Sequence, residues 1–270
     1  MKKFLSVLLS VMLIIVMVGC GRGEDPEKEL DKPKDAKTVL TDATEKMQDI
    51  DSMDFSMLMD MNMEINGEAV VMQMEMDVQV QNQGEENMKM AMPITMKMPS
   101  QGITMEMNMY YTEGYYYMDM LGSKVKAPMD VDEMMKSMKE GTSATDISTE
   151  GMTELKLEEK EDSCVISFVG DTEKMLEYSK SVMESMQSMS GLQGTDVALD
   201  SIKGTIAIDK DGYITEQIID MNMTMTMVVE GVATTITAIV STTTTYNNIG
   251  ESVKVELPNL SEYQEVSLTQ

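Results

Sequence analysis

Methionine is the residue type whose number and spacing are most unusual in this chain. The sequence contains 35 methionines, but only three phenylalanines and no tryptophan. The thioether sulfur is a soft ligand that selects Cu(I), and it can be oxidised reversibly to the sulfoxide. The unbranched side chain also adapts to irregular apolar surroundings. Metal binding, oxidant scavenging and apolar packing are therefore the chemistries to consider.

Methionines, together with a few Ile, Val and Phe residues, occupy every second position in several stretches of the chain. These stretches are 53–65, 72–80, 88–98, 103–109 and 219–227. Successive side chains of a β-strand point to opposite faces of the sheet. A period of two therefore places the methionines on one face and most of the intervening polar residues on the other. We expect an antiparallel meander with one apolar side and one solvent-facing side.

The apolar face has three open interpretations. It is a packed core, the wall of a cavity for a flexible hydrophobic ligand, or a Cu(I) site. Two sulfurs of an M-x-M pair lie ~6.6 Å apart along a strand, so one ion would need a bend or sulfurs from neighbouring strands. The candidate residues of the cavity wall are Met57, Met59, Met61, Met74, Met76, Met90, Met105, Met107, Met221, Met223 and Met225.

The residue types of common catalytic sites are missing. The chain has no histidine, which is the commonest general base and a frequent metal ligand. It also has no G-x-S-x-G, P-loop or G-x-G-x-x-G motif. The sequence 209–212 begins like a calcium-binding EF-hand loop, but the twelfth position, Asp220, falls inside a predicted strand. We therefore expect a hairpin turn there, and we expect no enzyme activity, no cofactor and no metal site.

The charge of the chain limits its partners. The formal net charge is −26 at pH 7. Phosphate backbones are bound by Lys and Arg, so we expect no nucleic-acid partner. We also expect no electrostatic attachment to anionic lipid, because a strongly negative chain is repelled by negative headgroups. The sequence identifies no protein partner.

The N-terminus has the composition of an export signal. Lys2 and Lys3 precede an apolar run over 4–18, which as a helix is ~23 Å long and too short for a bilayer core of ~30 Å. The run ends in Met17-Val18-Gly19-Cys20, which resembles the lipobox of bacterial lipoproteins. That resemblance implies cleavage after residue 19, diacylglyceryl attachment to Cys20 and a location on the outer face of the cell membrane. Two acyl chains suffice for stable anchoring.

The remaining chain divides into a tether, a domain and a tail. Residues 20–34 are polar, charged and contain two prolines, so we expect a disordered tether. We expect one domain over 35–258 and a short tail over 259–270. If Cys20 is acylated, Cys164 has no partner for an intrachain disulfide, and its apolar surroundings in the sequence favour a buried strand position.

Three amphipathic helices are predicted between the strands. Apolar residues follow helical spacing over 36–50, 131–138 and 172–189. Asp171 or Thr172 can cap the last helix. Further strands are expected at 115–120, 152–157, 164–169, 206–208, 232–246 and 253–257, with a loop over 191–200. The expected fold is α+β, a large curved antiparallel sheet (a half-barrel) with about three helices covering its concave apolar face.

This layout resembles the LolA/LppX-like lipoprotein fold and a group of Met-rich Gram-positive lipoproteins without an assigned role. The resemblance covers about residues 35–258. It rests on the lipobox, the helix ending in Met47-Gln48-Asp49-Ile50-Asp51-Ser52, the turn Asp209-Lys210-Asp211-Gly212-Tyr213 and the closing segment 246–258. The resemblance implies a half-barrel that carries acyl chains or lipidated molecules. The function predicted is non-catalytic binding or carriage of a hydrophobic ligand, and the alternative is an interaction lipoprotein with a packed core.

Overall fold

The computed structural model describes residues 35–65, 67–129, 151–174, 196–229 and 232–266. Helix α2 (Ala36–Gln48) comes first, and the rest of the described chain is mainly strand. All the described helices and strands lie between residues 35 and 266. Any fragment that contains these residues therefore contains the complete described fold.

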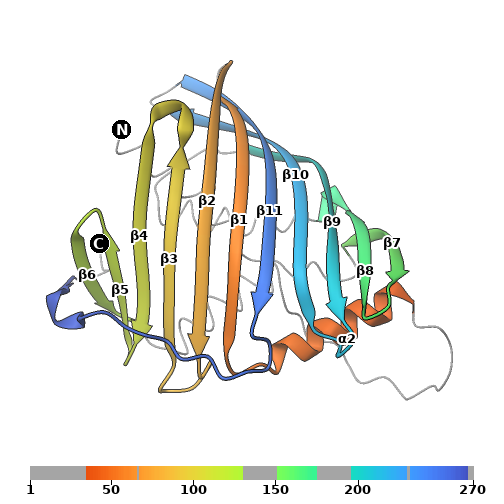
Figure 1. The fold of residues 1–270 in the computed structure, drawn as a ribbon. Helices are drawn as coiled ribbons and strands as arrows, with labels where there is room; N and C mark the ends of the chain where they lie inside the picture. Colours follow the sequence, from red (N-terminus) through yellow and green to blue (C-terminus); the bar gives the residue numbers. More distant parts are fainter. Residues whose placement is uncertain (1–34, 66, 130–150, 175–195, 230–231, 267–270) are drawn as a thin grey trace.

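Twelve strands form one sheet (Figure 1). The strands of the first half of the chain are β1 (Met53–Ile65), β2 (Glu68–Gln81), β3 (Lys89–Met98), β4 (Ile103–Thr112), β5 (Tyr115–Met120) and β6 (Ser123–Pro128). The others are β7 (Met152–Glu159), β8 (Ser163–Gly170), β9 (Asp196–Asp209), β10 (Ile214–Val229), β11 (Val232–Asn247) and β12 (Gln264–Glu265). Two short 3-10 helices, η1 (Pro99–Gln101) and η2 (Leu260–Glu262), complete the described elements.

The strand order shows that the sheet is two meanders joined in the middle. The order is β12-β6-β5-β4-β3-β2-β1-β11-β10-β9-β8-β7. Strand β1 pairs with β11 over twelve positions, from Asp54 opposite Asn247 to Ile65 opposite Ile236. All neighbours are antiparallel except β12, which pairs with β6 in parallel. The long β1–β11 ladder makes one continuous sheet of the two halves.

Tight turns set the register of the first meander. Gly67, in the turn between β1 and β2, has a φ of 86°. Glu113 and Gly114, between β4 and β5, both have positive φ angles of 52° and 74°. Two-residue hairpins of this kind need left-handed backbone, which glycine adopts without steric cost. These two turns therefore fix which residues of the paired strands lie opposite each other.

Helix α2 packs on the second meander. Asp35 caps it by accepting a hydrogen bond from the Thr38 amide at 2.8 Å, and this bond lowers the pKa of the Asp35 carboxyl. At its other end, the Lys46 ammonium lies 4.0 Å above the Tyr213 ring and also donates to the backbone carbonyl of Asp211. The apolar residues that α2 buries are Ala36, Leu40, Ala43 and Met47.

The predicted α+β class with about three helices on a concave face is wrong. A single twelve-stranded sheet dominates the molecule, and α2 is the one α-helix whose complete bounds the structure describes. Long strands make up most of the described chain: β10 and β11 have 16 residues each. The helix expected over 131–138 lies outside the described residues. The helix expected over 172–189 is described only to Lys174, where Asp171 accepts hydrogen bonds from the amides of Glu173 and Lys174.

Two further expectations about strand limits are corrected. Strand β9 begins at Asp196, so the predicted loop over 191–200 ends earlier than expected. The pairing of β9 with β10 shifts by one residue at Asp200. This shift keeps Val197 on the buried side of the sheet. The segment 253–257 is not an edge strand. Instead, Val253 and Val255 pack with Ala91 on the outer side of β3, and this segment leads towards β5 and β6 (Figure 1).

Candidate functional site

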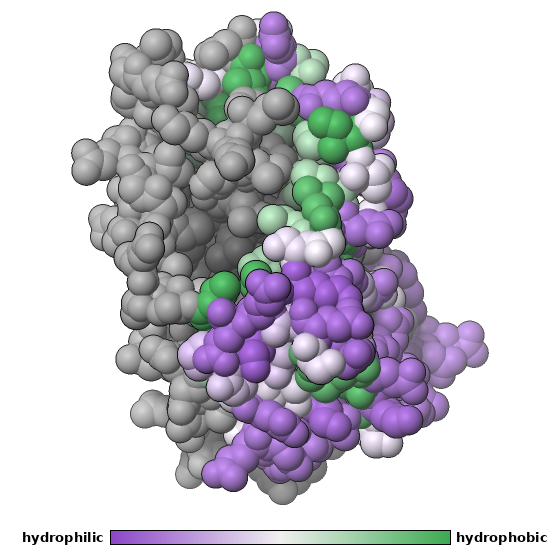
Figure 2. Space-filling view, turned by 90° about the vertical axis from the view of Figure 1, so that its left-hand side faces the viewer, coloured by the Kyte–Doolittle hydropathy of each residue, from purple (hydrophilic) through white to green (hydrophobic). Residues whose placement is uncertain are grey.

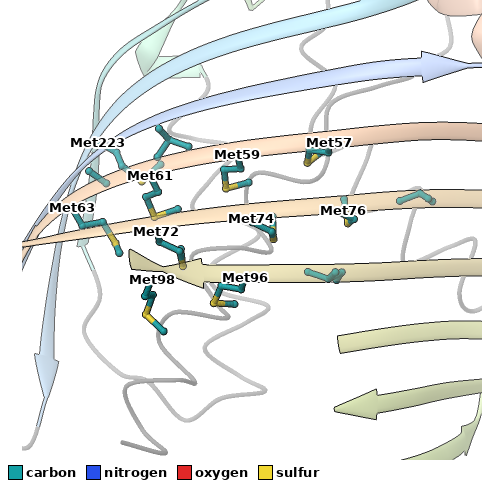
Figure 3. Packing of buried hydrophobic residues seen from close by; sticks show 14 of the residues in the cluster. Met57, Met59, Met61, Met63, Met72, Met74, Met76, Met96, Met98 and Met223 are labelled. Atoms are coloured by element: carbon teal, nitrogen blue, oxygen red, sulfur yellow. The ribbon is translucent and has the colours of Figure 1, made fainter. Parts of the chain in front are cut away.

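The methionines of the alternating stretches form one apolar cluster, which we call the methionine face. Its central members are almost completely buried: Met59 is 1% exposed and Met61 is 0% exposed. Figure 3 shows the labelled methionine side chains of β1, β2 and β3 pointing to the same side of the sheet. The predicted strand alternation is confirmed, because strand geometry alone puts these residues on a common face.

The register aligns methionines across neighbouring strands. Met59 lies opposite Met74, Met74 opposite Met96, and Met96 opposite Met105. One row of the methionine face therefore crosses β1 to β4 without a residue of another type. Directly opposite side chains in an antiparallel pair are close enough to touch. The row is a continuous surface of flexible, polarizable side chains.

The structure brings all the predicted candidate residues together. Those buried within the cluster are Met57, Met59, Met61, Met74, Met76, Met90, Met223 and Met225. Those partly buried against it are Met105, Met107 and Met221. The same cluster holds methionines that the prediction left out, namely Met63, Met72, Met88, Met96 and Met98. These methionines have the same period-two spacing in the sequence, so the same criterion would have identified them.

A second apolar cluster has a different composition. It lies under α2, on β7 to β10, and we call it the helix-covered core. Its buried residues are Ala36, Leu40, Ala43, Met47, Met152, Ile166, Phe168, Ile202, Ile206, Ile208, Ile214 and Ile219. Isoleucine, not methionine, supplies most of the sheet side of this core. One sheet therefore carries two apolar surfaces of distinct chemistry, side by side.

Buried polar groups separate the two surfaces. Gln217 on β10 and Thr242 and Thr244 on β11 are each less than 10% exposed. The prediction of an apolar face missed these three residues. They belong neither to the methionine face nor to the helix-covered core.

The opposite side of the sheet is mainly polar, and the exposed hydrophobic residues on it include Leu58, Val71 and Ile239. Gln73 donates to Asp60 at 2.7 Å, Ser241 donates to Asp220 at 2.8 Å, and Lys203 lies 3.9 Å from Asp220. These pairs run across the sheet from β2 to β9. Figure 2 shows the surface from the side of β5 and β6, where hydrophilic residues predominate and hydrophobic ones form smaller patches. The acidic residues between the methionines thus line the solvent side, as the alternation predicts.

Tyrosines border the methionine face at β5. The Tyr116 hydroxyl donates to the Met109 sulfur, and Tyr116 packs against the cluster. Burial disfavours the phenolate and raises the pKa of Tyr116 to about 12. On the other side of β5, Tyr117 meets Tyr263 edge-on with ring centroids 5.4 Å apart. This contact holds the C-terminal residues to the edge of the sheet.

The described residues offer few groups for other chemistry. No cluster of three or more His, Cys, Asp or Glu side chains suited to a metal occurs in the described ranges. The 209–212 segment forms a hairpin turn, in which Asp209 accepts hydrogen bonds from the amides of Asp211 and Tyr213. Cys164 is free, half-buried on β8, and burial raises the pKa of its thiol. Cys20 lies outside the described residues, and no helix within them is long and apolar enough to cross a membrane.

The chain belongs to a protein family of unknown function, DUF6612, which it matches over residues 35–259. No curated protein matches it at a significant level.

Two of the solved structures with a similar fold come from mycobacteria. LprF from Mycobacterium bovis is 14% identical, with 83% of this chain and 96% of that chain covered and a TM-score of 0.43. The lipoprotein LppX from Mycobacterium tuberculosis is 11% identical, with 82% and 98% covered and a TM-score of 0.42. These two likenesses confirm the predicted resemblance to LppX-like lipoproteins. With both TM-scores below 0.5, neither likeness bears on function.

Proposed function

We propose that this protein is a lipid-anchored lipoprotein on the outer face of the cell membrane that binds or carries a hydrophobic molecule on its methionine face. Cys20 receives the lipid, and residues 20–34 tether the domain. The protein acts by binding and performs no catalysis. Its negative charge keeps it away from nucleic acid and anionic headgroups.

The observation that supports this proposal is the contrast between the two apolar surfaces. Under α2 the sheet presents mainly isoleucine, which has few rotamers and specifies one packing arrangement. Across β1 to β4 it presents methionine, which is flexible and suits surfaces that must fit variable partners. A core built only for stability would be expected to use the same residue types in both places.

The competing function is a structural or interaction lipoprotein whose methionine face is simply a filled core. The very low exposure of Met59 and Met61, at 1% and 0%, favours this alternative. Binding of an apolar probe separates the two functions, because a filled core has no room for one.

The test uses residues 24–270, produced without lipidation, and N-phenyl-1-naphthylamine as a fluorescent apolar probe. A carrier is expected to bind the probe saturably. The triple variant Met59→Leu/Met74→Leu/Met96→Leu keeps side-chain volume but stiffens one row of the face. It is expected to bind severalfold more weakly. Ile206→Leu, in the helix-covered core, is the matched control and should bind normally.

Wild-type protein that binds no probe would contradict the proposal. Equal affinity for the probe in the triple variant and the wild type would show that the methionine row is not part of the binding site. Incubation with Cu(I), followed by metal analysis, tests the soft-metal alternative on the same protein.

A further inference from the structure

Three buried polar side chains interrupt the apolar side of the sheet at its centre. Gln217 is 6%, Thr242 4% and Thr244 7% exposed. They come from adjacent strands, β10 and β11, where the methionine face meets the helix-covered core. Apart from Thr112 at the end of β4, no other polar side chain is buried within the described ranges.

The register places all three on the same side as the methionines. Thr244 lies opposite Met57 on one flank and opposite Gln217 on the other. Thr242 lies opposite Met59 and Ile219. Directly opposite residues in antiparallel strands share a face of the sheet. The three polar groups are therefore inserted in rows that are otherwise apolar.

The hydroxyl of Thr242 lacks a partner among the described residues. Its oxygen is buried and makes no hydrogen bond within the part of the chain that the structure describes. Buried polar groups in native proteins are nearly always hydrogen-bonded, because water no longer satisfies them. A hydroxyl buried beside Met59 and Ile219, with no partner among the described residues, is free to hydrogen-bond to a bound molecule.

The chemistry of the three groups defines that partner. Threonine hydroxyls and a glutamine amide offer both donors and acceptors without charge. Among the described residues, none of the buried side chains is charged. A carboxylate or phosphate buried here would have no counter-charge, which makes its desolvation costly. An uncharged ester, amide or alcohol group fits the site.

We infer that Gln217, Thr242 and Thr244 form a polar subsite, which holds the uncharged ester or alcohol group of a ligand whose hydrocarbon part lies on the methionine face. This inference rests on the proposed function. The ligand class is then a neutral acyl ester, such as an acylglycerol, and excludes free fatty acids and phospholipids. Hydrogen-bonding groups at the border of an adaptable methionine wall would fix one end of the ligand while leaving its chain length free.

The test compares an uncharged ester with a purely apolar probe on the same protein. Residues 24–270 are loaded with N-phenyl-1-naphthylamine, which is then displaced by 1,2-dioctanoylglycerol or by octanoate. Thr242→Val replaces the hydroxyl with a methyl group of the same shape, and Thr244→Val is a second variant. Thr245→Val is the matched control, because Thr245 is exposed on the other side of β11. Circular dichroism verifies the fold of each variant.

We expect the wild type and Thr245→Val to bind dioctanoylglycerol alike and at least tenfold more tightly than octanoate. Thr242→Val should bind it about tenfold more weakly, as expected for one lost hydrogen bond. Its affinity for the apolar probe should stay within twofold of the wild type. Equal affinity for dioctanoylglycerol in the wild type and both subsite variants would overturn the subsite and leave the proposed function intact. Wild-type protein that binds no apolar probe would overturn both.

Discussion

Phe168 on β8 lies directly opposite Gly204 on β9, and its ring occupies the space that a Cβ at residue 204 would need. A Cβ built there would lie 2.7 Å from ring atoms of Phe168 and 2.5 Å from the carbonyl oxygen of Ile218. The glycine therefore allows the ring to lie against the backbone of β9. This contact is part of the helix-covered core, where packing is tight and residues cannot shift freely.

We predict that Gly204→Ala lowers the free energy of unfolding by ~1–3 kcal/mol, the usual cost of overpacking. Urea denaturation measures the change. Adding Phe168→Leu to Gly204→Ala should recover part of the loss, since the shorter side chain vacates the space. Full stability in the single variant would show that β8 and β9 can separate at this point.

Removing the unpaired hydroxyl should stabilise the protein without ligand. Thr242→Val is expected to raise the free energy of unfolding by ~1–3 kcal/mol, because a buried hydroxyl without a partner carries that desolvation cost. Thr245→Val, on the exposed side of the same strand, should change stability by less than ~0.5 kcal/mol. Thermal and urea denaturation of the delipidated protein provide the values. A loss of stability in Thr242→Val would show that the hydroxyl is satisfied in solution.

Truncation of a central methionine reports how closely the face is packed. Met61 is 0% exposed and Ile208, in the helix-covered core, is 2% exposed. Ile208→Ala should cost ~2–5 kcal/mol, the usual range for buried aliphatic side chains. In the proposed carrier, Met61→Ala costs less than Ile208→Ala, because neighbouring methionines rearrange and the face need not be filled. Equal costs would favour the filled-core alternative.

The stability of the protein should fall at alkaline pH through Tyr116. Its pKa is about 12 in the folded chain and 10.0 as the ordinary value, so between these values the unfolded chain has lost a proton that the folded chain retains. Stability therefore decreases as pH rises from 10 to 12, by up to ~1.4 kcal/mol per pH unit for this group. Tyr116→Phe should show a shallower decrease than the wild type. Tyr115→Phe, on the opposite side of β5, is the control, and an identical slope in Tyr116→Phe would contradict the assignment.

The sequence predicts the strands well where the alternation is strong. The first alternating stretch, 53–65, coincides with β1, because every second residue carries an apolar side chain. Strand β6, Ser-Lys-Val-Lys-Ala-Pro, has only Val125 and Ala127 as alternating apolar residues, and it was not predicted from the sequence. The segment 253–257 alternates like a strand, yet it packs on the outer side of β3 because Val253 and Val255 cover Ala91 there.

The polar subsite could not be predicted from the sequence for a different reason. Thr242 and Thr244 belong to a run of four threonines, 242–245, in which alternate residues face opposite sides. Which pair faces inward depends on the pairing of β11 with β1, and a shift of one residue would reverse it. Long-range register, not local composition, buries these two hydroxyls beside Gln217.

The central claim is that the methionine face binds a hydrophobic ligand, and native mass spectrometry of residues 24–270 tests it most directly. The protein is purified without detergent, measured intact, and then extracted with organic solvent. We expect a bound mass that is released on denaturation and recovered as a neutral acyl species. A protein that is empty as purified, and still empty after incubation with membrane lipids, would contradict the proposed function and leave a packed interaction domain.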